Sequence, residues 1–208
     1  MSVRQQYKQN SDMVYVFLAE GFEEIEAIAP VDILRRAGVE VKTVSISDDY
    51  VVTGAHGVSV MADTLIAQTA DSVPGGWNDA QRLGECDMIV LPGGLPGATN
   101  LDACQRLRDM IMMHHGMGKP IAAICAAPMV LGHLGILQGK RATCYPGVET
   151  ELTGAEYTAS LVEEDGHIIT GCGPAAAMEF GYRLASRFVS QEQVNALREG
   201  MRYTMLEK

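Results

Sequence analysis

Short, continuously apolar segments recur along this chain, and each is followed by a turn and a helix-like segment. The clearest examples are residues 13–19, 86–91 and 120–124, in which nearly every side chain is apolar. A strand that is apolar on both faces has to be covered on both faces, which is typical of a parallel sheet between two layers of helices. The sequence therefore predicts an α/β fold, a three-layer sandwich around a mostly parallel sheet.

The remaining segments fit the same architecture. Alternation predicts a strand at 39–46, and the glycine-interrupted segment 50–65 predicts a hairpin. Ser190 and Gln193 form a capping-box pattern that predicts the start of a last helix. Further helices are expected at 23–37, 98–117, 129–134 and 174–188, strand segments at 141–145 and 157–171, and a loop at 70–83. No repeat or linker divides the chain, so we expect a short disordered leader at 1–12 and a single domain at 13–208.

Charge and cysteine content exclude several classes of protein. The 208 residues carry a net charge of −10, which argues against a general nucleic-acid binder or a protein of anionic membranes. No apolar run is long enough to span a bilayer, and the polar N-terminus lacks the apolar region of a signal peptide. The five cysteines include no C-x-x-C pair, so neither a zinc ribbon nor a disulfide scaffold is expected. These features predict a cytoplasmic protein with reduced thiols and no metal site.

The segment around Cys125 carries the clearest chemical signal. The apolar run 121–124 ends on this cysteine, and a helix-like segment begins at Pro128. Side chains at such a turn lie above the carboxyl end of a strand, where open α/β sheets bind ligands. Amides at a helix start favour an anion, which is expected to lower the thiol pKa and make Cys125 a nucleophile. The alternative is an inert buried thiol, a common role of free cysteine.

Two other segments are expected at the same edge of the sheet. Gly93 and Gly94 follow a strand, and glycines there let backbone amides turn toward an oxyanion, although an ordinary turn is the alternative. Glu26 follows the first strand, and its helical neighbours three, four and seven residues on are apolar. Burial on that face raises the pKa of a carboxyl, so Glu26 could hold a proton near pH 7; the alternative is a solvated glutamate. The helix dipole alone accounts for Glu23 and Glu24.

The histidines do not provide an obvious partner for the cysteine. Cysteine hydrolases need an imidazole beside the thiol, but the residue after Cys125 is Ala126. His114 and His115 are expected at a solvated helix end. His56, in a glycine-flanked loop, is the one histidine that we retain as a candidate.

Taken together, several motifs resemble the ThiJ/PfpI superfamily, and most closely its DJ-one branch, that of the parkinsonism-associated deglycase. The resemblance extends from Val14 to Phe188, with the motifs in the family's order and spacing. The motifs are residues 20–26, 30–32, 35–38, 90–94, 122–128, 164–166 and 173–174. The fold that this resemblance implies is flavodoxin-like and related to class I glutamine amidotransferase domains.

The resemblance also implies roles for site residues. Cys125 corresponds to the family's oxidisable nucleophile, and Glu26 to the carboxyl that hydrogen-bonds it. Gly94 and Ala126 correspond to the residues whose amides form an anion pocket, with Gly93 beside them. Tyr145 stands where many members carry a histidine, which leaves Glu26 as the acid–base candidate.

A homodimer is implied as well, because Asp32, Arg36 and Pro174 correspond to the family's dimer-contact region. No cofactor and no membrane or nucleic-acid partner is implied, and the expected ligand is a small reactive aldehyde.

Two functions follow from the resemblance. One is a cofactor-independent glyoxalase or deglycase acting on methylglyoxal or glycation adducts. The other is a non-enzymatic oxidative-stress protein, a redox sensor or chaperone switched by oxidation of Cys125. Thiazole-phosphate (thiamine) biosynthesis and proteolysis, both assigned to relatives, fit less well. The protease-like branch has His where this chain has Ala126, and no cluster of Lys and Arg suggests a phosphate site.

Overall fold

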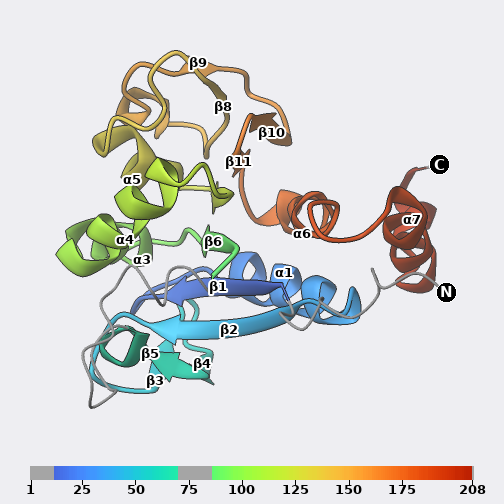
Figure 1. The fold of residues 1–208 in the computed structure, drawn as a ribbon, viewed down its shortest axis with the longest axis horizontal. Helices are drawn as coiled ribbons and strands as arrows, with labels where there is room; N and C mark the ends of the chain where they lie inside the picture. The colour runs from blue at the N-terminus through green and yellow to red at the C-terminus, as the bar shows by residue number, and fades with distance from the viewer. Residues whose placement is uncertain (1–11, 70–85, 208) are drawn as a thin grey trace, which may run out of the picture.

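The main sheet lies at the centre of the molecule (Figure 1) in the computed structural model, which describes residues 12–69 and 86–207. Its strands are β1 (Met13–Leu18), β2 (Glu40–Ser45), β5 (Thr64–Leu65), β6 (Met88–Leu91), β7 (Ile121–Ile124), β10 (Val162–Asp165) and β11 (Ile168–Gly171). They lie in the order β10–β11–β7–β6–β1–β2–β5. Every neighbouring pair is parallel except β10 with β11. The predicted mostly parallel sheet is confirmed.

Helices cover both faces of this sheet. The bounds are α1 (Glu24–Arg36), α6 (Ala177–Ala185) and α7 (Gln191–Gly200) on one face, and α3 (Gly97–Ala103), α4 (Gln105–Gly116) and α5 (Pro128–His133) on the other. β1 is buried against both layers: Val14 and Val16 belong to the cluster with α1 and α6, whereas Tyr15 and Phe17 belong to the cluster with α3, α4 and α5. The three-layer sandwich is therefore confirmed, and it explains why β1 is apolar at every position. No helix in the described ranges is long and apolar enough to cross a membrane.

The predicted hairpin lies beside the loop that follows β1. Its strands β3 (Val51–Thr53) and β4 (Ser59–Met61) pair antiparallel. Gly21 N–H donates to the Thr53 carbonyl, and Ala55 N–H donates to the Phe22 carbonyl, each at 2.8 Å. These bonds hold the turn of the hairpin at the carboxyl edge of the main sheet.

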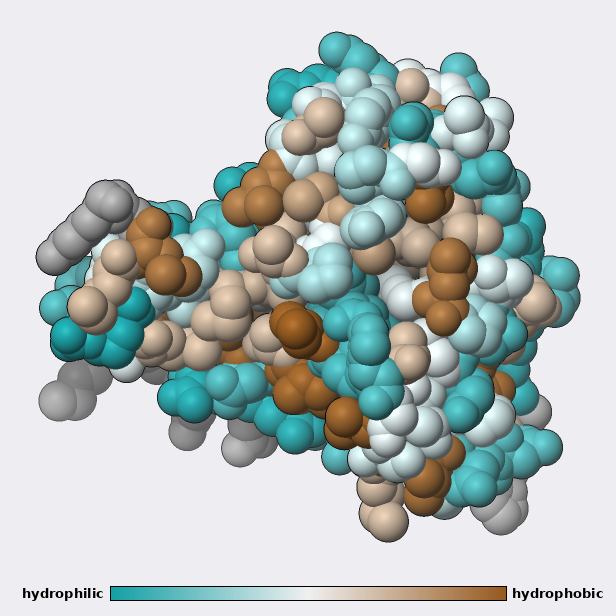
Figure 2. All heavy atoms as spheres, turned by 180° about the vertical axis from the view of Figure 1, so that it is seen from behind, coloured by the Kyte–Doolittle hydropathy of each residue, from teal (hydrophilic) through white to brown (hydrophobic). Residues whose placement is uncertain are grey.

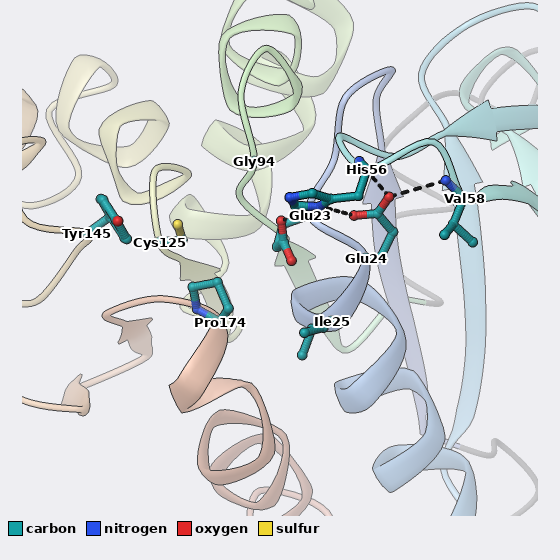
Figure 3. A pocket seen from close by; sticks show the side chains of 9 residues that line it. All are labelled: Glu23, Glu24, Ile25, His56, Val58, Gly94, Cys125, Tyr145 and Pro174. Carbon is teal, nitrogen blue, oxygen red and sulfur yellow. Dashed lines mark hydrogen bonds and ion pairs between the residues drawn. The ribbon is translucent and has the colours of Figure 1, made fainter.

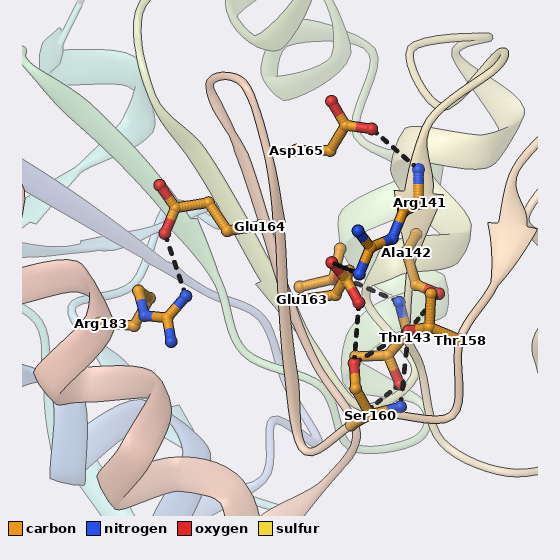
Figure 4. Close-up of polar contacts among 10 residues, drawn as sticks. Arg141, Ala142, Thr143, Thr158, Ser160, Glu163, Glu164, Asp165 and Arg183 are labelled. Carbon is orange, nitrogen blue, oxygen red and sulfur yellow. Dashed lines mark hydrogen bonds and ion pairs between the residues drawn. The ribbon is translucent and has the colours of Figure 1, made fainter.

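A second appendage follows α5. The short strands β8 (Arg141–Ala142) and β9 (Glu156–Tyr157) pair with each other, and polar contacts join them to β10 (Figure 4). The Arg141 guanidinium lies 2.8 Å from the Glu163 carboxylate, which also accepts the Ser160 hydroxyl at 3.1 Å. This network fixes the ends of the segment that carries Tyr145.

Short 3₁₀ turns complete the chain, and some predicted boundaries were wrong. The 3₁₀ turns are η1 (Ile66–Thr69), η2 (Glu149–Glu151), η3 (Pro174–Ala176) and η4 (Tyr203–Glu207). The helix expected at 98–117 is two helices, because the backbone of Cys104 is extended (φ −79°, ψ 96°) and separates α3 from α4. The helix expected from Pro174 begins with η3 and ends before Phe188. The Ser190 capping box is present and opens α7. Residues 1–11 of the expected leader and the loop expected at 70–83 lie outside the described residues.

His114 also differs from its expected position. Its side chain is buried rather than solvated, and a ring nitrogen lies 3.1 Å from the Pro120 carbonyl. Burial lowers the pKa of His114 to about 4. The imidazole is therefore a neutral group that packs under the end of α4, which the sequence pattern alone did not separate from a surface histidine.

Candidate active site

Cys125 lies immediately after β7 in a strained turn. Its φ is 65°, a left-handed conformation that is uncommon outside glycine and is often found at functional sites. Cys125 N–H donates to the Gly171 carbonyl, and the Cys125 carbonyl accepts Tyr145 N–H, each at 2.8 Å. These bonds hold the turn from both sides. Only 8% of Cys125 is exposed, and that exposed part borders a pocket.

Glu26 comes from the first turn of α1 and is buried beside this cysteine. It has no exposed surface, and Oε2 accepts the Gly93 N–H at 2.9 Å. Its other oxygen, Oε1, has no hydrogen-bond partner within the described residues. Burial raises the pKa of Glu26 to about 7, although the neighbouring Cys125 thiol and the Gly93 N–H favour the ionised carboxyl. The expectation of a buried carboxyl that can hold a proton near pH 7 is confirmed.

The expected lowering of the thiol pKa is wrong. Burial raises the pKa of Cys125 to about 12, with further increases from the charge of Glu26 and from its hydrogen bond. α5 has only six residues, so its dipole is small. The two adjacent groups titrate as a pair, which loses a first proton near pH 7 and holds the second until about pH 12. Near neutral pH and above, the pair therefore carries one negative charge distributed between the sulfur and the carboxyl.

Backbone amides around the sulfur favour that charge. Hydrogen bonds from Gly94 and Ala126 lower the thiol pKa, in opposition to burial. Gly93 was expected to belong to this group, but its N–H is taken by Glu26, so it positions the carboxyl instead. A methyl group on Gly93 would lie 2.7 Å from both Cys125 Cβ and Glu26 Oε2. Only glycine allows the thiol and the carboxyl to approach this closely.

A pocket of about 630 Å³ opens above the sulfur (Figure 3). Cys125, Gly94 and Tyr145 lie on one side of it, and the start of α1 and the β3–β4 turn lie on the other. The lining residues are Glu23, Glu24, Ile25, His56, Val58, Gly94, Cys125, Tyr145 and Pro174. None of them is Lys or Arg, so the pocket is suited to a small ligand with little negative charge.

His56, the histidine retained as a candidate, lies at the pocket rim, but the sequence prediction missed its contact with Glu24. His56 Nδ1 lies 2.9 Å from Glu24 and 3.3 Å from Glu23. Ligand-type atoms of these three residues lie within 4.8 Å of one another, the one such grouping of three in the described ranges. These atoms are not free to bind a metal ion, because the contact between the ring and the carboxylates requires a proton on Nδ1. Hydrogen bonds with His56 and neighbouring amides lower the pKa of Glu24 to about 2, although burial acts to raise it.

Of the residues assigned to a dimer region, Asp32 and Arg36 lie outside the pocket, whereas Pro174 lines it. Asp32 and Arg36 form an exposed i, i+4 ion pair on α1 at 2.8 Å. Pro174 lines the pocket at the start of η3. Figure 2, which shows the molecule from behind, has apolar side chains interspersed with polar ones on this face. The large exposed hydrophobic residues of α1 and the hairpin include Ile25, Ile28, Val58 and Met61, which we call the apolar band.

Comparison with known proteins gives consistent matches. A profile of the DJ-1/PfpI family matches residues 12–187. Protein DJ-1 homolog B of Arabidopsis thaliana is 36% identical over 194 residues, which are 92% of this chain and 42% of that protein. This chain therefore spans less than half the length of the Arabidopsis relative. Protein dj-1beta of Drosophila melanogaster is 33% identical over 193 residues, 92% of this chain and 97% of that protein. A Pyrococcus abyssi protein named as a deglycase is 30% identical over 164 residues, 77% of this chain and 90% of that protein.

Solved structures agree with these matches. Toxoplasma gondii DJ-1 in an oxidized form superposes with a TM-score of 0.82 at 34% identity, covering 92% of this chain and 98% of that one. Drosophila melanogaster DJ-1beta gives the same TM-score and identity, covering 92% and 97%.

Proposed function

Because this chain belongs to the DJ-1/PfpI family, as its motifs predicted, we propose that it converts small reactive carbonyl compounds as a cofactor-independent glyoxalase or deglycase. The observation that carries the proposal is the pairing of Cys125, in its strained turn, with the buried carboxyl of Glu26. The name of the Pyrococcus relative points to the same chemistry. A cytoplasmic location belongs to this proposal, since the reaction requires a reduced thiol.

The proposed reaction uses the single negative charge of the pair. With the proton on Glu26, the Cys125 sulfur attacks the aldehyde carbon of methylglyoxal and forms a hemithioacetal. The amides of Gly94 and Ala126 stabilise the developing oxyanion. Glu26 gives its proton to this oxyanion, and the resulting carboxylate then moves a proton from the first carbon to the second through an enediol, which leaves a thioester. Water cleaves the thioester, so that methylglyoxal and water give lactate and the thiol is restored.

The test is methylglyoxal consumption with lactate detection, in the absence of glutathione. We expect turnover by the wild type and none by Cys125→Ala. Cys104→Ala is the matched control, because Cys104 is half-buried between α3 and α4 and does not line the pocket. Turnover that survives in Cys125→Ala, or a folded and reduced wild type without turnover, would contradict the proposal.

A second candidate is a stress-response role through oxidation of Cys125, as a redox sensor or redox-switched chaperone. It is favoured by the unpartnered Oε1 of Glu26, since a protonated carboxyl there could donate to a sulfinate oxygen. Two equivalents of peroxide would convert the thiol to sulfinic acid with release of two waters. Intact-mass analysis after mild peroxide should show two oxygens added at Cys125 alone. Equal oxidation of all five cysteines would contradict this role.

A further inference from the structure

We propose that His56, oriented by Glu24, is a second acid–base residue of this site and acts on a substrate held by Cys125. The inference rests on the function proposed above and extends it. The position that holds a histidine in many relatives is Tyr145 here, and His56 enters the same pocket from a different segment, the β3–β4 turn.

Glu24 holds the histidine segment at three points. Its Oε2 pairs with His56 Nδ1 at 2.9 Å, and its Oε1 accepts the backbone N–H groups of His56 at 2.8 Å and Val58 at 3.3 Å (Figure 3). The Glu24 side chain is only 13% exposed, whereas that of His56 is 70% exposed. A largely buried carboxylate therefore orients an accessible imidazole, which is how carboxylates orient catalytic histidines.

The other ring nitrogen is available for a ligand. Nδ1 faces Glu23 and Glu24 and must carry a proton, whereas Nε2 has no hydrogen-bond partner among the described residues. Figure 3 shows the ring at the rim of the pocket, opposite the Cys125 sulfur. A substrate bound between these two groups would meet the sulfur on one side and Nε2 on the other.

The surrounding charges favour the protonated form of this imidazole. The hydrogen bond to Glu24 raises the pKa of His56, and the charges of Glu23 and Glu24 raise it further. The other titratable groups facing the turn are Cys125 and Tyr145 across the pocket and Glu20, which accepts Thr53 N–H at 3.0 Å. No Lys or Arg lines the pocket. His56 is therefore the one side chain lining the pocket that can carry a positive charge.

This arrangement predicts both a role and a substrate preference. When the sulfur has added to an aldehyde carbon, Nε2–H can donate to the oxygen on the neighbouring carbon as the enediol forms. Glu26 takes the proton from the first carbon and returns it to the second. The oxygen on the second carbon keeps the proton from Nε2 as a hydroxyl, and the imidazole recovers a proton from the hydroxyl on the first carbon, which becomes the thioester carbonyl. A 2-oxoaldehyde supplies that second oxygen, whereas a simple aldehyde does not. The site should therefore prefer 2-oxoaldehydes.

The experiment compares pH profiles of kcat/KM for methylglyoxal in the wild type, His56→Gln, Glu24→Gln and His115→Gln. The pH profile of the wild type should be bell-shaped. Its rising limb, near pH 7, comes from the Cys125–Glu26 pair, and its falling limb comes from His56. His56→Gln should lose the falling limb and about 100-fold in kcat/KM. Glu24→Gln should move the falling limb to lower pH. His115→Gln is the control, because His115 lies on α4 outside the pocket.

Two readouts separate this role from a structural one. The rate at which iodoacetamide alkylates Cys125 should stay within about twofold in His56→Gln, because the thiol and Glu26 are unchanged. A parallel loss of alkylation, or an unchanged falling limb in His56→Gln, would overturn the inference while leaving the proposed function standing. A wild type without turnover would instead refute the proposed function, and the acid–base role of His56 with it.

Discussion

Glu26 is needed for the proposed reaction, but its burial destabilises the fold once the carboxyl is ionised. Among the described residues it is the carboxyl with no exposed surface, and burial raises its pKa from 4.5 to about 7. A carboxyl whose pKa is higher in the folded state stabilises the fold below its unfolded pKa, and this contribution is lost as the pH rises through the folded pKa. The candidate site is therefore built at the expense of stability at neutral pH.

Glu26→Gln should remove that pH dependence. The difference between 4.5 and about 7 corresponds to roughly 3 kcal/mol of unfolding free energy. Between pH 4.5 and pH 7.5, the free energy of unfolding of the wild type should fall by about this amount relative to that of the variant. Above pH 7.5 the difference should change little. Urea denaturation at pH 4.5, 6 and 7.5 measures the difference, with the exposed Glu192→Gln as control. A wild-type-to-variant difference that is constant with pH would contradict the prediction.

The same variant should change the reactivity of the thiol. In the wild type the rate of Cys125 alkylation should rise with an inflection near pH 7, where the pair loses its first proton. Glu26→Gln has no group that ionises there, so the inflection should move above pH 8. The measurement is iodoacetamide labelling followed by intact mass from pH 5 to pH 10. Retention of the inflection near pH 7 in Glu26→Gln would assign it to another group.

Residues differ in how far the sequence alone could predict them. The burial of Glu26 follows from apolar neighbours on one helix face, which is a local pattern. The pairing of His56 with Glu24 is not local, because it requires the hairpin to fold back against the loop after β1. The signal that could have found it is the position of His56 in a glycine-flanked turn between two short strands, opposite an acidic helix start.

At the scale of elements, the β3–β4 hairpin and α1 fit together at Gly54. A methyl group added there would lie 2.4 Å from the Glu24 carboxyl carbon. Gly54→Ala should therefore push the carboxylate away from His56 and lower the pKa of the imidazole, because the shift depends on that hydrogen bond. An NMR titration of the His56 ring measures the effect.

A second substitution in the same turn provides the control. A methyl group at Gly57 would meet nothing within 4 Å, and the φ of +81° there is tolerated by asparagine better than by most residues. Gly57→Asn should leave the pKa of His56 unchanged. Equal shifts in the two variants would show that general loosening of the hairpin, rather than displacement of Glu24, is responsible.

At the scale of the whole molecule, the sheet was predictable because its strands are apolar on both faces, which few other architectures accept. The division between α3 and α4 was not, since no residue pattern around Cys104 marks the extended backbone that separates the two helices. The thiol pKa was mispredicted for a related reason: burial and a neighbouring charge outweigh a helix of six residues.

The apolar band beside the pocket leads to the last prediction, that the protein is a homodimer. Ile25 and Val58 line the pocket, and Ile28 and Met61 extend the same apolar surface away from it. A second copy packed on the apolar band would bury these side chains and narrow the open side of the pocket. Dimers with C₂ symmetry are also the commonest soluble oligomers. The band joins α1, which carries Asp32 and Arg36.

Light scattering with size exclusion should therefore give twice the chain mass of 22.4 kDa for the wild type. Ile28→Lys should give the monomer mass, because an unpaired charge would be buried in the interface. Met112→Lys is the matched control, since Met112 on α4 is 43% exposed and Ile28 is 42% exposed, but they lie on opposite layers of the sandwich. A monomeric wild type would contradict the prediction, and so would dissociation of the Met112→Lys variant alone. The Ile28→Lys variant can also be tested for turnover and for the rate of Cys125 alkylation. Lower turnover with unchanged alkylation would show that the second copy contributes to the substrate pocket and does not affect the reactivity of the thiol.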